Sequence, residues 1–263
     1  MFTINPFSEL SGLISPFTMQ AYVVVMILLV AGSTILDVIH KKSAQYFFQN
    51  AEKAKAQASR SVSGGEKVAI AVKTVAQDVL TSAEFDNQRR RVAHLLTMYG
   101  FILFAATTAI MIFGYAGDSA TPAILPLLWH LGALILCFGG YWFYLFIRVD
   151  VSAEGNPWYR VIRADLFILS LLATATFALI WSALQAAGVA GWSTLFFCLF
   201  IFASTVLFGG VLWSKFPHMF FKPAAAFQKR VAKADGSRDG LPEPADKPEQ
   251  FGPGIKRLQP KNY

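Results

Sequence analysis

Residues 124–147 read ILPLLWHLGALILCFGGYWFYLFI, a run that contains no Lys, Arg, Asp or Glu. An α-helix of this length, at about 1.5 Å per residue, crosses the roughly 30 Å hydrocarbon core of a bilayer. Because lipid offers no partners to backbone N–H and C=O groups, such a segment has to be helical. The stretch therefore predicts a transmembrane helix.

The same pattern occurs four more times, and the composition agrees with it. Of the 263 residues, 55% are hydrophobic and only 15% are charged, whereas a typical soluble domain has about 25% charged residues. The sequence therefore predicts an all-α integral membrane protein, a multi-pass five-helix bundle. The predicted spans are 17–39, 95–115, 124–147, 166–187 and 192–212.

The basic residues predict the orientation of these spans. All 23 Lys and Arg lie in 41–91, in 148–163 or from Lys215 onward, and the links 116–121 and 188–191 have none. Cytoplasmic loops of membrane proteins collect Lys and Arg. We therefore predict an outer N-terminus and a cytoplasmic C-terminus. The net charge of +7 is then a topology signal, and no nucleic-acid partner is predicted.

The segment 41–93 is predicted to form a cytoplasmic helical hairpin between the first and second spans. It opens with good helix formers, is broken by SVSGG at 61–65, and continues as EKVAIAVKTVAQDVL. In that second part, valines at spacings of three and four place one apolar face on a helix. The face could pack on the protein itself, or dock on the membrane surface or a partner. The valines are Val68, Val72, Val75 and Val79.

The C-terminal residues are rich in Gly, Pro and charge, which is typical of disorder. The sequence thus divides into five parts. These are an outer N-terminal segment (1–16), the first transmembrane helix (17–40), the cytoplasmic hairpin (41–93), transmembrane helices two to five (94–215) and a largely disordered cytoplasmic tail (216–263).

Four histidines are the main candidates for chemistry, and the predicted topology sorts them by depth. His40, His94 and His218 fall at the cytoplasmic boundary, whereas His130 falls in the third span, roughly 10 Å from its outer end. Ionisable residues within a membrane are rare and mark functional sites by default. An alternative stays open, in which boundary histidines hydrogen-bond headgroups or helix ends.

Two neutral imidazoles on facing helices can hold one haem. His94 and His218 lie at matching predicted depth and could form such a pair, and His40 could replace either. His130 has no second histidine at its own depth. A bis-histidine haem on the outer side is therefore not predicted.

A quinone headgroup would need hydrogen-bond donors and a proton route at the membrane edge. His40 follows Asp37 by three residues, so the two share a helix face, and Asp165 opens the fourth span. These three residues are the quinone-site candidates. For Asp165 the favoured alternative is an ion pair with Arg148, Arg160 or Arg163.

Three stretches carry a resemblance to a known family. They are RRRVAHLLTMYGFILFAATT at 89–108, RADLFILSLLATATFALIW at 163–181 and WSKFPHMFFKP at 213–223. They resemble the membrane cytochrome b subunits of the nitrate reductase gamma and heterodisulfide reductase type. The whole chain is similar to membrane anchor subunits associated with adenylylsulfate reductase in sulfur-oxidising bacteria.

The resemblance implies a cofactor, a substrate and a partner. The family's haem-ligand positions match His94 and His218, with His130 as a third. Members with two haems have two histidines on the last span, whereas the outer part of this span, STLFFCLFIFAS at 193–204, has none. The resemblance therefore implies one haem b at most, membrane quinone as substrate, and a cytoplasmic flavin and iron–sulfur oxidoreductase of the adenylylsulfate reductase kind as partner.

The predicted function is that of a membrane anchor and electron-transfer subunit. It would link such a sulfur-metabolism oxidoreductase to the quinone pool, and would be at most the quinone-reactive subunit of that complex. A purely structural anchor without a cofactor is the main alternative. A small transporter is a weaker one, because the sequence lacks evident internal repeats.

Overall fold

The computed structural model of the chain is almost entirely helical in the residues it describes. Those residues are 2–40, 43–56, 58–83, 85, 87–117, 120–150, 155–214, 218–237, 250–251 and 255–256.

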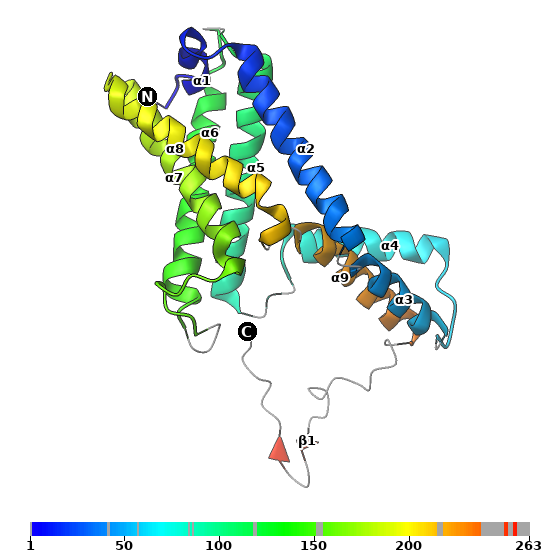
Figure 1. Cartoon of the computed structure of the whole chain (residues 1–263). Helices are drawn as coiled ribbons and strands as arrows, with labels where there is room; N and C mark the ends of the chain where they lie inside the picture. Colours follow the sequence, from blue (N-terminus) through cyan, green and yellow to red (C-terminus); the bar gives the residue numbers. More distant parts are fainter. Residues whose placement is uncertain are drawn as a thin grey trace. The chain divides into compact units, whose positions relative to one another are not determined.

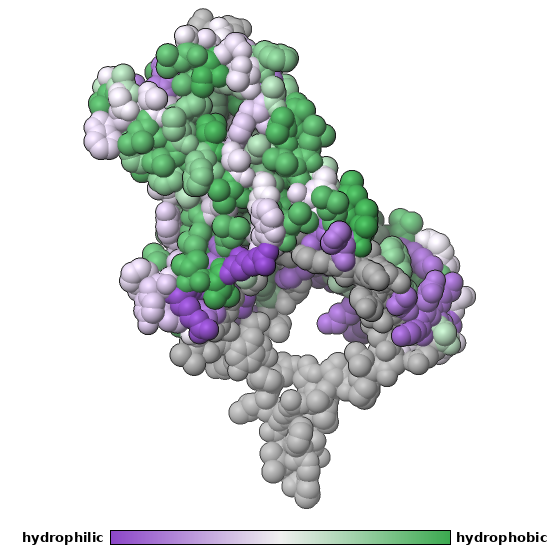
Figure 2. Space-filling view, viewed as in Figure 1, coloured by the Kyte–Doolittle hydropathy of each residue, from purple (hydrophilic) through white to green (hydrophobic). Residues whose placement is uncertain are grey.

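Five helices are long and apolar enough to cross a membrane, which confirms the prediction of a multi-pass helical protein (Figure 1). The second begins ahead of the predicted start at 95, because polar residues add turns before the apolar run. Hydrophobic residues cover most of the visible face of these helices in Figure 2. The helices are α2 (Pro16–His40), α5 (Gln88–Gly114), α6 (Ile124–Trp142, continued by the π-helix η3, Phe143–Ile147), α7 (Leu166–Ala186, preceded by the 3-10 turn η4, Arg163–Asp165) and α8 (Ala190–Gly209).

The chain divides into two compact units. Unit 1 comprises Met1–Ile35 and Val92–Phe216, and unit 2 comprises Leu36–Arg91 and Pro217–Tyr263. Unit 1 contains most of the membrane-spanning helices, together with the short elements α1 (Pro6–Glu9), η1 (Leu10–Gly12) and η5 (Val211–Trp213).

Glycines bring α5 and α6 into backbone contact in unit 1. A Cβ on Gly100 would lie 2.5 Å from the Leu136 amide nitrogen, and one on Gly132 would lie 2.7 Å from the Phe104 nitrogen. A Cβ on Gly139 would lie 2.8 Å from the Ala93 carbonyl oxygen. Small residues commonly allow membrane helices to approach this closely. The glycines therefore serve helix packing at this interface.

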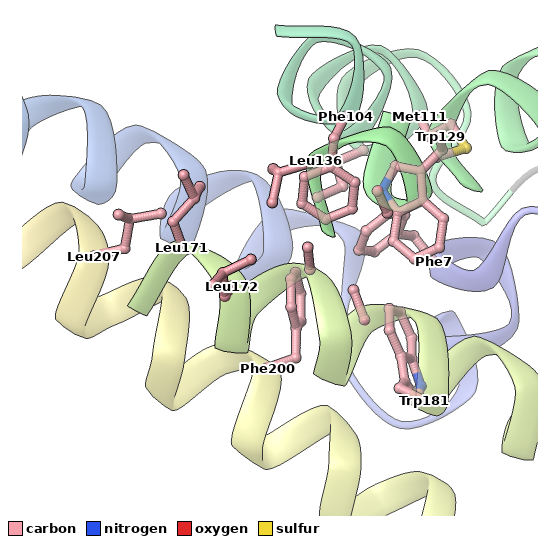
Figure 3. Packing of buried hydrophobic residues seen from close by; sticks show 14 of the residues in the cluster. Phe7, Phe104, Met111, Trp129, Leu136, Leu171, Leu172, Trp181, Phe200 and Leu207 are labelled. Atoms are coloured by element: carbon pink, nitrogen blue, oxygen red, sulfur yellow. The ribbon is translucent and has the colours of Figure 1, made fainter. Parts of the chain in front are cut away.

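Helices α7 and α8 form an antiparallel hairpin, and their apolar side chains build the core. The turn between them places Gly188 at φ +73°, where a side chain would be strained. Trp181 of α7 stacks on Phe200 of α8 with ring centroids 5.7 Å apart. Figure 3 shows this pair beside Phe7 and Trp129 in the same buried cluster.

Unit 2 is a small helical assembly. Its helices are α3 (Ser43–Ala56), α4 (Gly64–Thr74), the π-helix η2 (Val75–Leu80) and α9 (His218–Asp235). Both α3 and α4 contact α9. The Arg230 guanidinium of α9 donates to both carboxylate oxygens of Asp78, at 2.7 and 3.0 Å.

Two predictions concern the residues of unit 2, namely the cytoplasmic hairpin 41–93 and the largely disordered tail 216–263. Two helices do lie in the predicted hairpin segment 41–93, but a cytoplasmic hairpin stays a prediction. Helix α9 was not predicted, and the rest of the predicted disordered tail falls largely outside the described residues. Two short strands, β1 (Gln250–Phe251) and β2 (Ile255–Lys256), pair antiparallel within it.

Candidate functional site

His130 is buried in unit 1 and both of its ring nitrogens have protein partners. Nδ1 lies 2.6 Å from the Pro126 carbonyl oxygen, one turn earlier on α6. Nε2 lies 2.8 Å from the Ser182 hydroxyl of α7. Because a carbonyl oxygen can only accept, Nδ1 carries the proton and the neutral ring accepts from Ser182 at Nε2. The imidazole thus joins α6 to α7.

Aromatic rings surround this imidazole. Trp129 meets it edge-on at a centroid distance of 4.8 Å, and Phe2 does so at 5.0 Å. Trp129 also contacts Phe7 of α1 and Trp181 of α7, as Figure 3 shows. An iron bound at Nε2 would have to displace the Ser182 hydroxyl within this packed aromatic cluster. The role of His130 as a third haem ligand stays a prediction.

The N-terminal residues cover this end of the bundle. The Asn5 side-chain oxygen accepts from the Phe7 backbone nitrogen, which caps α1, and its amide donates to Thr121 at 3.1 Å. The Gln185 amide of α7 donates to the Pro6 carbonyl at 3.1 Å and to the Glu9 carboxylate at 2.5 Å. Short polar contacts therefore fix α1 over the end of α7.

A small pocket opens between these elements. Its polar lining residues are Ser182 and Gln185, one turn apart on α7, and Glu9, which is bound to Gln185. Since Ser182 also contacts His130, the buried imidazole has a hydroxyl between it and this opening. The arrangement could pass a proton between Nε2 and the pocket. The lining residues are Ile4, Pro6, Glu9, Ser182, Gln185 and Ala186.

Asp165 lies at the opposite end of α7 in a buried ion pair with Arg148. The guanidinium Nη2 lies 2.5 Å from the Asp165 carboxylate, and the two side chains are 1% and 8% exposed. The Ile162 amide also donates to this carboxylate, at 2.9 Å. Of the three arginines predicted as alternatives, Arg148 forms this ion pair. A quinone at Asp165 stays a prediction.

Arg148 holds the connecting loop as well as Asp165. Its guanidinium donates to the carbonyl oxygens of Pro157, at 3.2 Å, and Arg160, at 2.8 Å, and it lies over the Tyr144 ring. The π-helix η3 ends here, with the Arg148 amide donating to the Phe143 carbonyl five residues earlier. This wider turn positions the arginine under the loop.

The remaining predicted site residues lie in both units. His94 is half-buried on α5 in unit 1, whereas Asp37 is buried and His40 exposed near the end of α2 in unit 2. His218 begins α9 in unit 2, and its side chain lies outside the described part of the chain. The pairing of His94 with His218 therefore stays a prediction. Within the described residues, no cluster of three or more His, Cys, Asp or Glu could hold a metal ion.

Sequence reasoning did not find Ser182, Gln185 or Asn5. A signal was present for Ser182, because α6 and α7 run antiparallel. His130 lies six residues after the start of α6 and Ser182 four residues before the end of α7, so their depths differ by only about 3 Å. A search for any polar partner at that depth, rather than for a second histidine, would have found it.

A comparison of the chain with protein-family models, with curated proteins and with solved structures found no match in any of the three.

Proposed function

We propose that this protein anchors a soluble oxidoreductase at the cytoplasmic face of a bacterial inner membrane and exchanges electrons between it and membrane quinone. The observation that carries the proposal is the division of the chain into a membrane bundle and a compact polar helical unit. Five crossings bring every link between the two units to one side of the bilayer. The distribution of Lys and Arg supports the cytoplasm as that side.

The proposed partner and cofactor come from the resemblance described above. The partner would be a flavin and iron–sulfur enzyme of the adenylylsulfate reductase kind. One haem b would be held by His94 and His218, and would relay single electrons between the partner and quinone. His40, Asp37 and Asp165 are the proposed quinone-contacting residues.

A structural anchor without a cofactor is the second candidate, and specific contacts favour it. The backbone contact of α5 with α6 at Gly100 and Gly132 leaves no room for a planar group at that interface. Both nitrogens of His130 are also bound within the protein. On this alternative, the bundle holds unit 2 at the membrane and all electron transfer occurs in the partner.

Two measurements on the protein purified from its native membrane separate the candidates. We expect a tagged chain to retrieve a soluble flavin and iron–sulfur protein. We also expect the dithionite-reduced minus oxidised spectrum to show a b-type α-band that His94→Ala and His218→Ala each remove. His40→Ala is the matched boundary control and should leave the band in place. A flat spectrum with intact retrieval would reject the haem and leave the structural anchor.

A further inference from the structure

An apolar face that runs along α4 and the start of η2 is exposed. Val68, Val72 and Val75 are 63%, 63% and 51% exposed. Exposed Ala69 and Ala76 lie beside them. We refer to these five residues as the valine face. Charged residues are missing from this strip, which runs along about two and a half turns of helix.

Contacts on the other side of the helix fix its rotation. Thr74 is buried, and Asp78 of η2 is bound by Arg230 of α9. The Ser63 side chain caps the first turn of α4 by accepting from the Glu66 amide. The helix is thus held by its polar side, and the valine face points away from α9.

The charges of α4 and η2 complement an anionic surface. Their two carboxylates are already paired, Glu66 with Arg60 and Asp78 with Arg230. Lys67 and Lys73 are exposed and make no ion pair with the described residues. On a helical wheel Lys73 borders the valine face, about 40° from Ala69, whereas Lys67 lies about 80° beyond Val75, near Thr74. An apolar strip bordered by lysines is typical of helices that lie in the membrane interface.

Chain connections allow this helix to reach the bilayer. Five crossings place the end of α2, the start of α5 and the end of α8 at one membrane face. In the sequence, helix α4 lies between the end of α2 and the start of α5. From the end of η2 at Leu80 to the start of α5 at Gln88 the chain can reach at most about 28 Å. A soluble partner is therefore not needed to bring an apolar surface to the valine face.

We propose that the valine face lies in the interfacial region of the anionic leaflet, with Lys73 directed to lipid phosphates and the exposed Lys67 adding positive charge to the same helix. Burial of valine and alanine side chains at the acyl boundary would favour this position, and each lysine would add electrostatic attraction. Of the proposed function, this proposal uses only the five spans and their orientation, and it is independent of electron transfer. It leaves the surfaces of α3 and α9 for a soluble partner.

Spin-label depth measurements on the full-length protein in nanodiscs test this proposal. The native cysteines would be replaced (Cys137→Ala, Cys198→Ala), and a nitroxide would be attached at Val72→Cys. The matched control is Lys229→Cys, an exposed position on α9. In nanodiscs containing phosphatidylglycerol, we expect the ratio of oxygen to nickel-chelate accessibility to be higher at 72 than at 229.

Two further variants make the result decisive. Val68→Asp should lower the ratio at 72 to that of the control. Lys67→Glu combined with Lys73→Glu should lower it in phosphatidylglycerol, and in pure phosphatidylcholine should change it little. Two results would overturn the proposal. One is a water-like accessibility ratio at position 72 in the protein without the Val68, Lys67 and Lys73 substitutions. The other is the same ratio at position 72 in phosphatidylglycerol and in phosphatidylcholine. Protection of the label from both reagents only in the native complex would show a protein partner instead.

Discussion

The two ends of the bundle in unit 1 both bury polar groups, but in different ways. At one end, the His130 imidazole is held by a carbonyl oxygen and a hydroxyl among aromatic rings. At the other, the Arg148 guanidinium is held by the Asp165 carboxylate and by loop carbonyl oxygens. We call these the histidine end and the arginine end.

The difference follows from where the charges of the sequence lie. The arginine end borders the basic loop 148–163, whereas the links at the histidine end contain no Lys or Arg. A buried ion pair is costly to break, because removal of one partner leaves an uncompensated charge. A neutral hydrogen bond costs less to remove. The comparison therefore predicts a more rigid arginine end and a histidine end whose polar groups are cheaper to change.

The largest effect is expected at the arginine end. Arg148→Ala would leave the Asp165 carboxylate buried without its counter-charge and would release the loop. We expect the free energy of unfolding to fall by about 3–5 kcal/mol, measured by steric trapping in nanodiscs.

Two controls define this result. Arg163→Ala removes an exposed arginine of the same loop and should change the free energy by less than about 0.5 kcal/mol. The double variant Arg148→Met with Asp165→Leu should recover part of the loss. Equal losses in Arg148→Ala and Arg163→Ala would contradict the buried ion pair.

A smaller effect is expected in the contact of α5 with α6. Gly100→Ala would place its Cβ 2.5 Å from a backbone nitrogen of α6, so the helices must separate. We expect a loss of about 1–3 kcal/mol in the free energy of unfolding, by the same method. Gly32→Ala on α2 is the matched control, since its Cβ would meet nothing within 4 Å. Stabilisation by both substitutions would rule out the close backbone approach.

The histidine end should respond more mildly. Ser182→Ala removes the donor to His130 and should cost about 1 kcal/mol of unfolding free energy. Ser170→Ala is a matched control on the same helix. The Ser170 hydroxyl donates to the carbonyl oxygens of Leu166 and Phe167, so this substitution removes a hydrogen bond within one helix. A Ser182→Ala loss no larger than that of Ser170→Ala would show that the bond between α6 and α7 contributes nothing.

The smallest effect concerns an exposed ion pair, which contrasts with the buried one. The hydrogen bond from Arg60 lowers the pKa of the Glu66 carboxyl in unit 2. Since the folded pKa lies below the unfolded one, the pair stabilises unit 2 above the unfolded pKa and this contribution is lost as pH falls through the folded pKa. Carboxyl NMR titration should show a higher midpoint for Glu66 in Arg60→Ala. An unchanged midpoint would refute the interaction.

The helices of the bundle could be predicted from the sequence, because hydrophobic length alone determines a membrane span. The predicted span 124–147 coincides with α6 and η3. Helix α9 could not be predicted in the same way, since its sequence mixes apolar and charged residues and includes Pro223. Its contacts with η2, such as Arg230 with Asp78, link positions far apart in the chain.

The candidate sites were predictable only in part. The sequence indicated that Asp165 would pair with an arginine, but its position does not distinguish Arg148 from its neighbours. The π-turn of η3, which positions Arg148, has no evident sequence signal. The depth of His130 could be predicted from the span that contains it, while its partner Ser182 comes from the antiparallel packing of α6 on α7.

Quinol-driven electron transfer in the native complex tests the central claim most directly. The complex would be retrieved from native membranes with the tagged chain, reconstituted in proteoliposomes and mixed with a quinol. We predict reduction of the soluble partner's cofactors at a rate that depends on the quinol and is lost in His94→Ala, while His40→Ala keeps the complex intact. A retrieved complex that shows no exchange of electrons with either quinol or quinone would contradict the electron-transfer role and leave a structural anchor.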